Sequence, residues 1–222
     1  MAELPLPLVA FLTGFISELL LSIPVGPVNL TIMNEGARNG FKWAALIGLG
    51  AVVMELIYCA LAFTGFASFF EAGWIKAVME LGSFFFMLYL GIKFLTTKKI
   101  EGYDRVQQRV EEKLHPHSAF MIGFVRVMAN IGVFAFWIVL AVSFIGHRWV
   151  QDNWPSKLTC IAGVAAGTGL WFFGLSYGVS RGHGKFTEKT LLRMEHWSGV
   201  GLIALALGHG AHIVWQMSRH KY

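Results

Sequence analysis

The stretch Ser22-Ile23-Pro24-Val25-Gly26-Pro27-Val28-Asn29 interrupts an apolar run from Leu6 to Met33 that is otherwise typical of a membrane span. Pro24 and Pro27 have no backbone N–H to donate, and each ring clashes with the preceding helical turn, so an α-helix cannot continue here. In hydrocarbon, freed backbone groups are tolerated only where they contact protein or line a polar cavity. Transporters build substrate sites at such breaks. The alternative interpretation is a proline kink that serves only packing.

The composition predicts an all-α integral membrane protein. Of the 222 residues, 55% are hydrophobic and only 14% are charged, and the apolar residues gather in runs long enough to cross a bilayer. The first run has no preceding Lys or Arg and no clear cleavage site, so we expect it to be retained. Little sequence lies outside the runs, which predicts a single transmembrane domain over 1–222. The six predicted transmembrane helices are 6–33, 43–66, 74–97, 119–146, 157–180 and 195–217.

The basic residues predict the orientation in the membrane. Segments that join spans 1–2, 3–4 and 5–6 hold eleven Lys and Arg, whereas the other side holds five. Because cytoplasmic loops carry the excess of Lys and Arg, both termini are expected to be non-cytoplasmic. The formal net charge of +5 belongs to these loops beside the lipid bilayer and does not indicate nucleic acid as a partner.

The two halves of the chain resemble each other. Gly14-Phe15 in span 1 has a counterpart in Gly123-Phe124 of span 4, and spans 2 and 5 are both rich in glycine near their beginnings. Three spans per copy is an odd number, so the second copy is expected to be inverted relative to the first. The sequence thus predicts inverted repeats at about 6–97 and 119–217, joined by a cytoplasmic loop at about 98–117. The small residues of Gly163–Gly167 could pack within one chain or in a homo-oligomer.

Ionisable residues near the bilayer centre are costly and are candidates for function. Glu18 lies six residues before Pro24, and Glu55 lies midway along span 2 beside a glycine-rich stretch. Arg126 precedes Asn130 by four residues, so both face one side of span 4. An alternative for Arg126 is a buried ion pair with one of the two acids.

The span 6 candidate is His209, which Gly208 and Gly210 flank. It could contact a ligand, or it could be a hydrogen-bonded packing histidine. Cys59 and Cys160 lie in apolar spans without a CxxC partner, and we expect both to pack rather than to bind metal or carry redox chemistry.

The break itself suggests a ligand. A helix that restarts at Pro27 directs free N–H groups and its positive dipole end into the break, which favours a carboxylate. The Asn29 side chain could add a donor, and Glu18 or Glu55 could bind an ammonium group. Positive and negative ends a few ångströms apart predict a site for a small zwitterionic or cationic solute such as an amino acid, with no cofactor or metal.

These motifs resemble the LysE/RhtB type of amino-acid translocator along nearly the whole chain. The family's Pro-x-Gly-Pro-x-Asn signature matches Pro24–Asn29, its acidic position in span 2 matches Glu55, and Phe136-Trp137 matches its span 4. One departure is Ile131, which follows Asn130 where the family has proline, so span 4 is not required to break. The resemblance implies a bacterial inner-membrane exporter of amino acids, driven by the proton gradient.

Two other classes of protein were weighed against a permease. A membrane-embedded enzyme or redox protein is disfavoured because the chain has no HExxH motif or paired cysteines, and because its loops are too short to hold a separate active site. A lipid-handling or accessory membrane protein, with the break serving as a hinge, stays open as the alternative. The sequence predicts a transporter rather than an enzyme.

Overall fold

The computed structural model describes residues 5–24, 26–65, 73–98, 118–181 and 188–219. This part of the chain is all-α and contains no strand. The helices are α1 (Leu6–Ser22), α2 (Pro27–Asn39), α3 (Phe41–Gly65), α4 (Gly73–Thr96), α6 (Ala119–Met128), α7 (Ile131–Gly146), α8 (Trp154–Arg181) and α9 (Glu188–Arg219). Most of the predicted loop at 98–117 lies outside the described residues.

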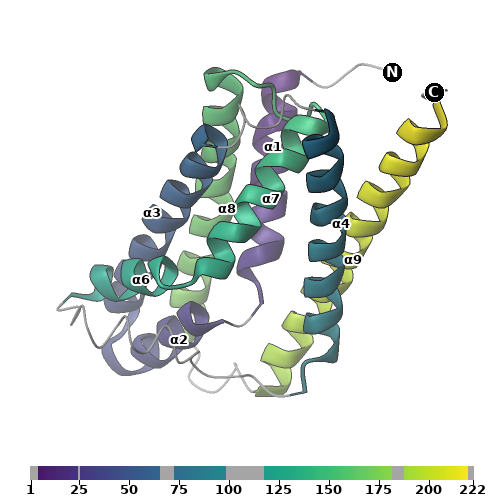
Figure 1. Ribbon diagram of the computed structural model, residues 1–222. Coiled ribbons are helices and arrows are strands. Elements are labelled where there is room, and N and C mark those ends of the chain that lie inside the picture. Colours follow the sequence, from purple (N-terminus) through teal and green to yellow (C-terminus); the bar gives the residue numbers. More distant parts are fainter. Residues whose placement is uncertain (1–4, 25, 66–72, 99–117, 182–187, 220–222) are drawn as a thin grey trace.

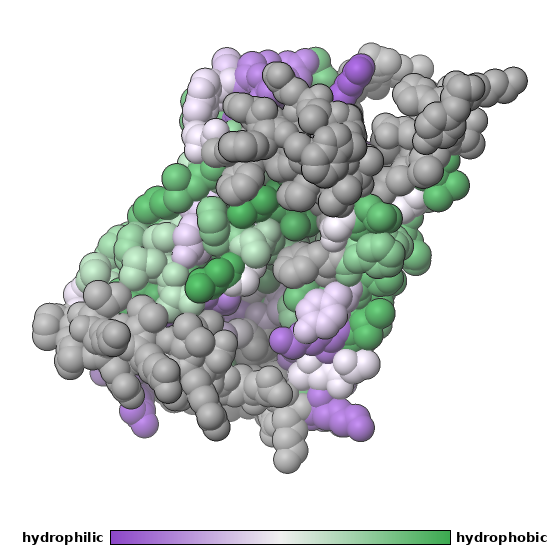
Figure 2. Space-filling model, viewed as in Figure 1, coloured by the Kyte–Doolittle hydropathy of each residue, from purple (hydrophilic) through white to green (hydrophobic). Residues whose placement is uncertain are grey.

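Several of these helices have the length and apolar composition of membrane spans. Among the described residues, α3 over Phe41–Thr64 and α8 over Trp154–Arg181 are each long and apolar enough to cross a membrane. The pairs α1–α2 and α6–α7 also meet this test if each pair is taken as one bent span, with bends of 70° and 64°. Hydrophobic residues gather across the middle of the face shown in Figure 2, with hydrophilic residues toward its two ends. The fold is therefore that of a multi-pass membrane protein.

The helices form an elongated bundle in which α2 lies across one end (Figure 1). The most extensive interfaces join α1 to α8, α3 to α6, and α4 to α9. Each of these pairs combines a helix from the first half of the chain with one from the second half. The start of α1 and the end of α9 lie toward the same end of the bundle, opposite α2 (Figure 1).

The break in the first span lies where the prolines predict it. α1 ends at Ser22, and α2 begins at Pro27, where a missing N–H costs nothing because first-turn N–H groups have no intrahelical partner. α2 then ends at Asn39 and is followed by Gly40, whose φ of 81° and ψ of −178° suit glycine alone. This glycine turns the chain directly into α3, so the apolar run predicted as one span is two helices.

The second bent span breaks without a proline. α6 ends at Met128, and α7 begins after Asn130, whose ψ of 81° is not helical. The carbonyl of Met128 accepts a hydrogen bond from the Tyr58 hydroxyl of α3 at 2.6 Å. Ile131 therefore does not restore a continuous helix, because a contact from another helix stabilises the break.

Glycines allow the helices to approach closely. A Cβ at Gly14 would overlap the Cys160 carbonyl on α8, and one at Gly163 would overlap the Phe11 carbonyl on α1. The same reciprocal arrangement joins Gly123 of α6 with α3. The small-residue surface of α8 therefore packs against α1 of the same chain.

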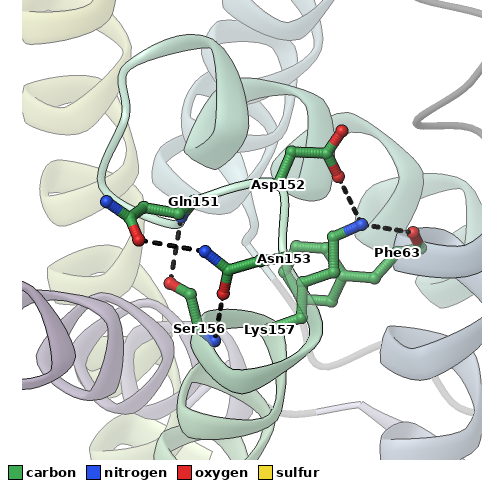
Figure 3. A network of polar contacts seen from close by, with 6 residues as sticks. All are labelled: Phe63, Gln151, Asp152, Asn153, Ser156 and Lys157. Carbon is green, nitrogen blue, oxygen red and sulfur yellow. Dashed lines mark hydrogen bonds and ion pairs between the residues drawn. The ribbon is translucent and has the colours of Figure 1, made fainter.

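The turn between α7 and α8 is held by the polar network of Figure 3. The amide N–H of Ser156 donates to Asn153 Oδ1 at 2.9 Å, which caps the beginning of α8. Lys157, the first residue of the fifth predicted span, is buried in α8. Its ammonium group pairs with Asp152 at 2.5 Å and donates to the Phe63 carbonyl of α3 at 3.4 Å, which offsets the cost of burying the charge.

Candidate functional site

Glu18 lies in the last turn of α1, directly before the first break. Its side chain is only 2% exposed. The Ser22 hydroxyl, one turn later on the same helical face, donates to Glu18 Oε1 at 2.8 Å. The carboxyl group is thus held at the end of α1 inside the protein.

The second expected acid meets the first. Glu55 of α3 is 8% exposed, and its carboxyl group lies close to that of Glu18. On α8, Thr168 Oγ1 donates to the Val164 carbonyl at 2.8 Å and lies 3.5 Å from Glu55 Oε2. Three helices therefore bring two carboxyl groups and a hydroxyl together. We call Glu18 and Glu55 the acidic pair.

The acidic pair has a definite chemical consequence. A carboxylate can only accept hydrogen bonds, so two carboxyl groups can bond to each other only if one of them carries a proton. Two buried negative charges in contact would be strongly unfavourable without a cation. The arrangement is therefore suited to holding a proton or a positively charged group. The buried thiol of Cys59 lies near both carboxyl groups and Cys160, within range of electrostatic interaction.

Asn29 spans the first break with its side chain. Its Nδ2 donates to the carbonyl of Ser22 at 2.9 Å and to that of Pro24 at 2.6 Å, while its Oδ1 accepts from Trp171 Nε1 of α8 at 3.1 Å. Both amide hydrogens that could serve a ligand are engaged with the backbone. Ser22 connects Asn29 to the acidic pair, because its hydroxyl contacts Glu18 and its carbonyl contacts Asn29.

The other residues of the first-span motif shape the break. The Gly26 N–H donates to the Pro24 carbonyl at 2.9 Å, and the Pro27 carbonyl accepts from the Thr31 hydroxyl at 2.7 Å. A Cβ at Gly26 would meet no atom within 4 Å among the described residues. The backbone at this position therefore borders open space rather than a packed contact.

Arg126 lies against α2. It is 8% exposed, its Nη1 donates to the Pro27 carbonyl at 3.3 Å, and the Glu35 carboxylate attracts it electrostatically. The ion pair with Glu18 or Glu55 stays an alternative for this side chain. A cation thus lies beside the first residue of α2.

The remaining candidates are less closely connected. Asn130 lies at the beginning of α7, and its side chain makes no cap for that helix. His209 belongs to α9, but its side chain lies outside the described residues. Among the residues that the structure describes, no group of three His, Cys, Asp or Glu could hold a metal ion.

Three contributors to this region were not candidates from the sequence. Ser22 and Thr168 contact the acidic pair, and Trp171 holds Asn29. A polar residue within an apolar span was the available signal for the two hydroxyls. An indole in a membrane helix carries no such signal, because its N–H partner depends on packing.

Fold and site together define a multi-pass membrane protein with a buried polar centre beside a broken helix. Residues 19–210 match the model of the LysE type translocator family. The chain belongs to the LysE translocator family, whose members are membrane transporters.

Named relatives extend over most of the chain. It is 28% identical over 207 residues to the "Putative amino acid efflux protein YcgF" of Bacillus subtilis (strain 168), covering 93% of this chain and 98% of that protein. It is 30% identical over 167 residues to the "Arginine exporter protein ArgO" of Enterobacter sp. (strain 638), covering 75% and 76%. The Klebsiella pneumoniae (strain 342) protein of the same name is 27% identical over 69% of this chain and 70% of its own length. No solved structure matches the chain.

Proposed function

We propose that this chain is a secondary transporter that exports amino acids, or similar small zwitterionic or cationic solutes, across the bacterial inner membrane. The acidic pair beside the first break is the observation that carries the proposal. Membership of the LysE family and similarity to proteins named for amino acid efflux and arginine export support it. The alternative is an accessory or lipid-handling membrane protein in which the break is a hinge.

The proposed substrate position uses both signs of charge. The acidic pair binds the substrate ammonium, and the first-turn N–H groups of α2 bind its carboxylate, since a helix N-terminus attracts anions. Arg126 at the Pro27 carbonyl adds positive charge at that end. Pro24, Gly26, Asn29 and Asn130 shape the two breaks, and His209 is retained as a candidate on the route.

Coupling to the proton gradient follows from the same acidic pair. When no substrate is bound, a proton bridges Glu18 and Glu55, and a substrate ammonium replaces it as the counter-charge. Because proton and ammonium compete for one place, outward movement of substrate alternates with inward return of the proton. The exchange is obligatory provided that the empty, doubly ionised pair does not change sides.

Two inverted three-helix repeats would place the acidic pair near the symmetry axis between them. Glu55 and Thr168, whose side chains contact each other, are 113 residues apart. Gly50 and Gly163, which contact Phe120 and Phe11 respectively, have the same separation. This constant spacing supports the proposed repeats and the six spans α1–α2, α3, α4, α6–α7, α8 and α9.

We expect both termini to lie outside the cytoplasm. The end of the bundle opposite them holds the α2–α3 turn and the end of α8 (Figure 1), where Arg38, Lys42 and Arg181 lie. A reporter fused after Tyr222 that is active only outside the cytoplasm should therefore be active. If a reporter that is active only in the cytoplasm is active at that position, the expected orientation is wrong.

Solute counterflow in proteoliposomes tests the proposed function directly. Vesicles loaded with an unlabelled amino acid should accumulate the labelled form transiently, with L-arginine as the first probe and the other amino acids in turn. Vesicles with ionophore but no protein are the control. If the intact protein exchanges none of them, the accessory-protein alternative is favoured.

A further inference from the structure

Two aromatic side chains donate hydrogen bonds at the two helix breaks. Trp171 of α8 donates from Nε1 to Asn29 Oδ1 at 3.1 Å. Tyr58 of α3 donates from its hydroxyl to the Met128 carbonyl at 2.6 Å. Each donor comes from one half of the chain and contacts the break in the other half.

At the first break, the indole decides the direction of an amide. An asparagine side chain can rotate by half a turn, which exchanges its oxygen and nitrogen. The Trp171 N–H needs an acceptor, so it holds the amide oxygen toward α8. The nitrogen must then face the carbonyls of Ser22 and Pro24, where both of its hydrogens are used.

At the second break, the phenol replaces a missing helical partner. Met128 is the last residue of α6, and carbonyls at a helix C-terminus have no intrahelical donor. Left unpaired in a membrane interior, such a carbonyl would be costly. Ile131 begins a separate helix, and the Tyr58 hydroxyl supplies the hydrogen-bond donor for the Met128 carbonyl.

Both donors lie beside the acidic pair. Tyr58 follows Glu55 by three residues, and Trp171 follows Thr168 by three, so each shares a helical face with a member of the site. Tyr58 and Trp171 are also 113 residues apart, the separation of Glu55 and Thr168. The two donors thus occupy corresponding places in the two halves.

We propose that Trp171 and Tyr58 are matched positioning residues that fix the two breaks relative to the acidic pair. Each ties the conformation of one break to the middle helix of the opposite half, so that neither break can rearrange without the other half responding. The consequence for transport rests on the proposed function, whereas the positioning itself does not.

Hydrogen–deuterium exchange of the purified protein tests the positioning without any substrate. Trp171→Phe keeps an aromatic ring and removes the donor. Trp171→His removes ring volume but keeps an N–H, because histidine Nε2 occupies the ring position of tryptophan Nε1. We expect exchange in the peptide around Gly26–Leu30 to be about tenfold faster in Trp171→Phe, since a buried hydrogen bond is lost. Trp171→His should stay close to wild type.

Tyr58→Phe provides the second arm. Removing the hydroxyl should accelerate exchange around Asn130–Val133 by a similar factor, with little change at the first break. Trp197→Phe and Tyr177→Phe are matched controls, because both side chains are exposed and lie outside the site. Neither control should change exchange at either break.

If Trp171 serves only packing, the two Trp171 variants should show the opposite order of exchange rates. Trp171→His would then exchange faster than Trp171→Phe, and that result overturns the proposal. Unchanged exchange at the breaks in both Trp171→Phe and Tyr58→Phe overturns it as well. Exchange is measured without substrate, so the two proposals can fail separately. If counterflow is absent but exchange is still faster in Trp171→Phe than in Trp171→His, the proposed function is rejected and the positioning role stands.

Discussion

Replacing Glu55 with glutamine is expected to lower counterflow at least about 30-fold while leaving the protein folded. Glutamine keeps the size of the side chain and can still hydrogen bond with Glu18, so packing among α1, α3 and α8 should survive. The charge that balances a substrate ammonium is lost. Initial rates in proteoliposomes, with thermal unfolding of the same preparations, measure the two properties separately.

Glu55→Asp is the matched variant, because it keeps the carboxylate and shortens its reach. It should retain more activity than Glu55→Gln. If Glu55→Gln inserts normally and exports at the wild-type rate, Glu55 is a structural acid, and the carboxylate role passes to Glu18.

Replacing Gly123 with alanine is expected to destabilise the protein strongly. The added Cβ would overlap the Ile47 carbonyl and lie 3.0 Å from the Ala51 nitrogen, so it meets backbone that cannot move aside as a side chain does. Overpacking of this kind costs about 1–3 kcal/mol, and backbone contacts favour the upper end. Thermal unfolding in detergent should show a clearly lower midpoint.

Gly174→Ala is the control for this substitution. Its Cβ would meet nothing within 4 Å among the described residues, so the change tests alanine in a membrane helix without a clash. Its midpoint should equal or exceed that of the wild type. Equal midpoints for both variants would mean that α3 and α6 do not approach each other this closely.

Local rules predicted the first break, and non-local contacts explain why they did not predict the second. Pro24 and Pro27 exclude a continuous helix by covalent geometry alone. At Asn130 no residue forbids a helix, and the contact at the break comes from the Tyr58 hydroxyl, 70 residues before its partner Met128. A single sequence contains no signal for such a contact until the helices are packed.

The same distinction separates the predicted parts of the site from the rest. Glu18 and Glu55 are recognisable singly as buried acids, but only the packing of α1 and α3 against α8 shows that they meet. For Arg126 the sequence left an ion pair with one of them as an alternative, and only the packing shows that its Nη1 donates to the Pro27 carbonyl. The sequence left open that Asn29 adds a donor for a ligand, and the structure shows its Nδ2 donating to two carbonyls of the break itself.

The most direct measurement of the central claim is proton release on substrate binding. Wild-type protein in weakly buffered detergent solution is titrated with an amino acid that exchanges in counterflow, and a pH dye reports protons while calorimetry reports binding. Competition at the acidic pair predicts release of roughly one proton for each substrate bound, and none from Glu55→Gln. Substrate binding to the wild type without proton release would contradict the claim.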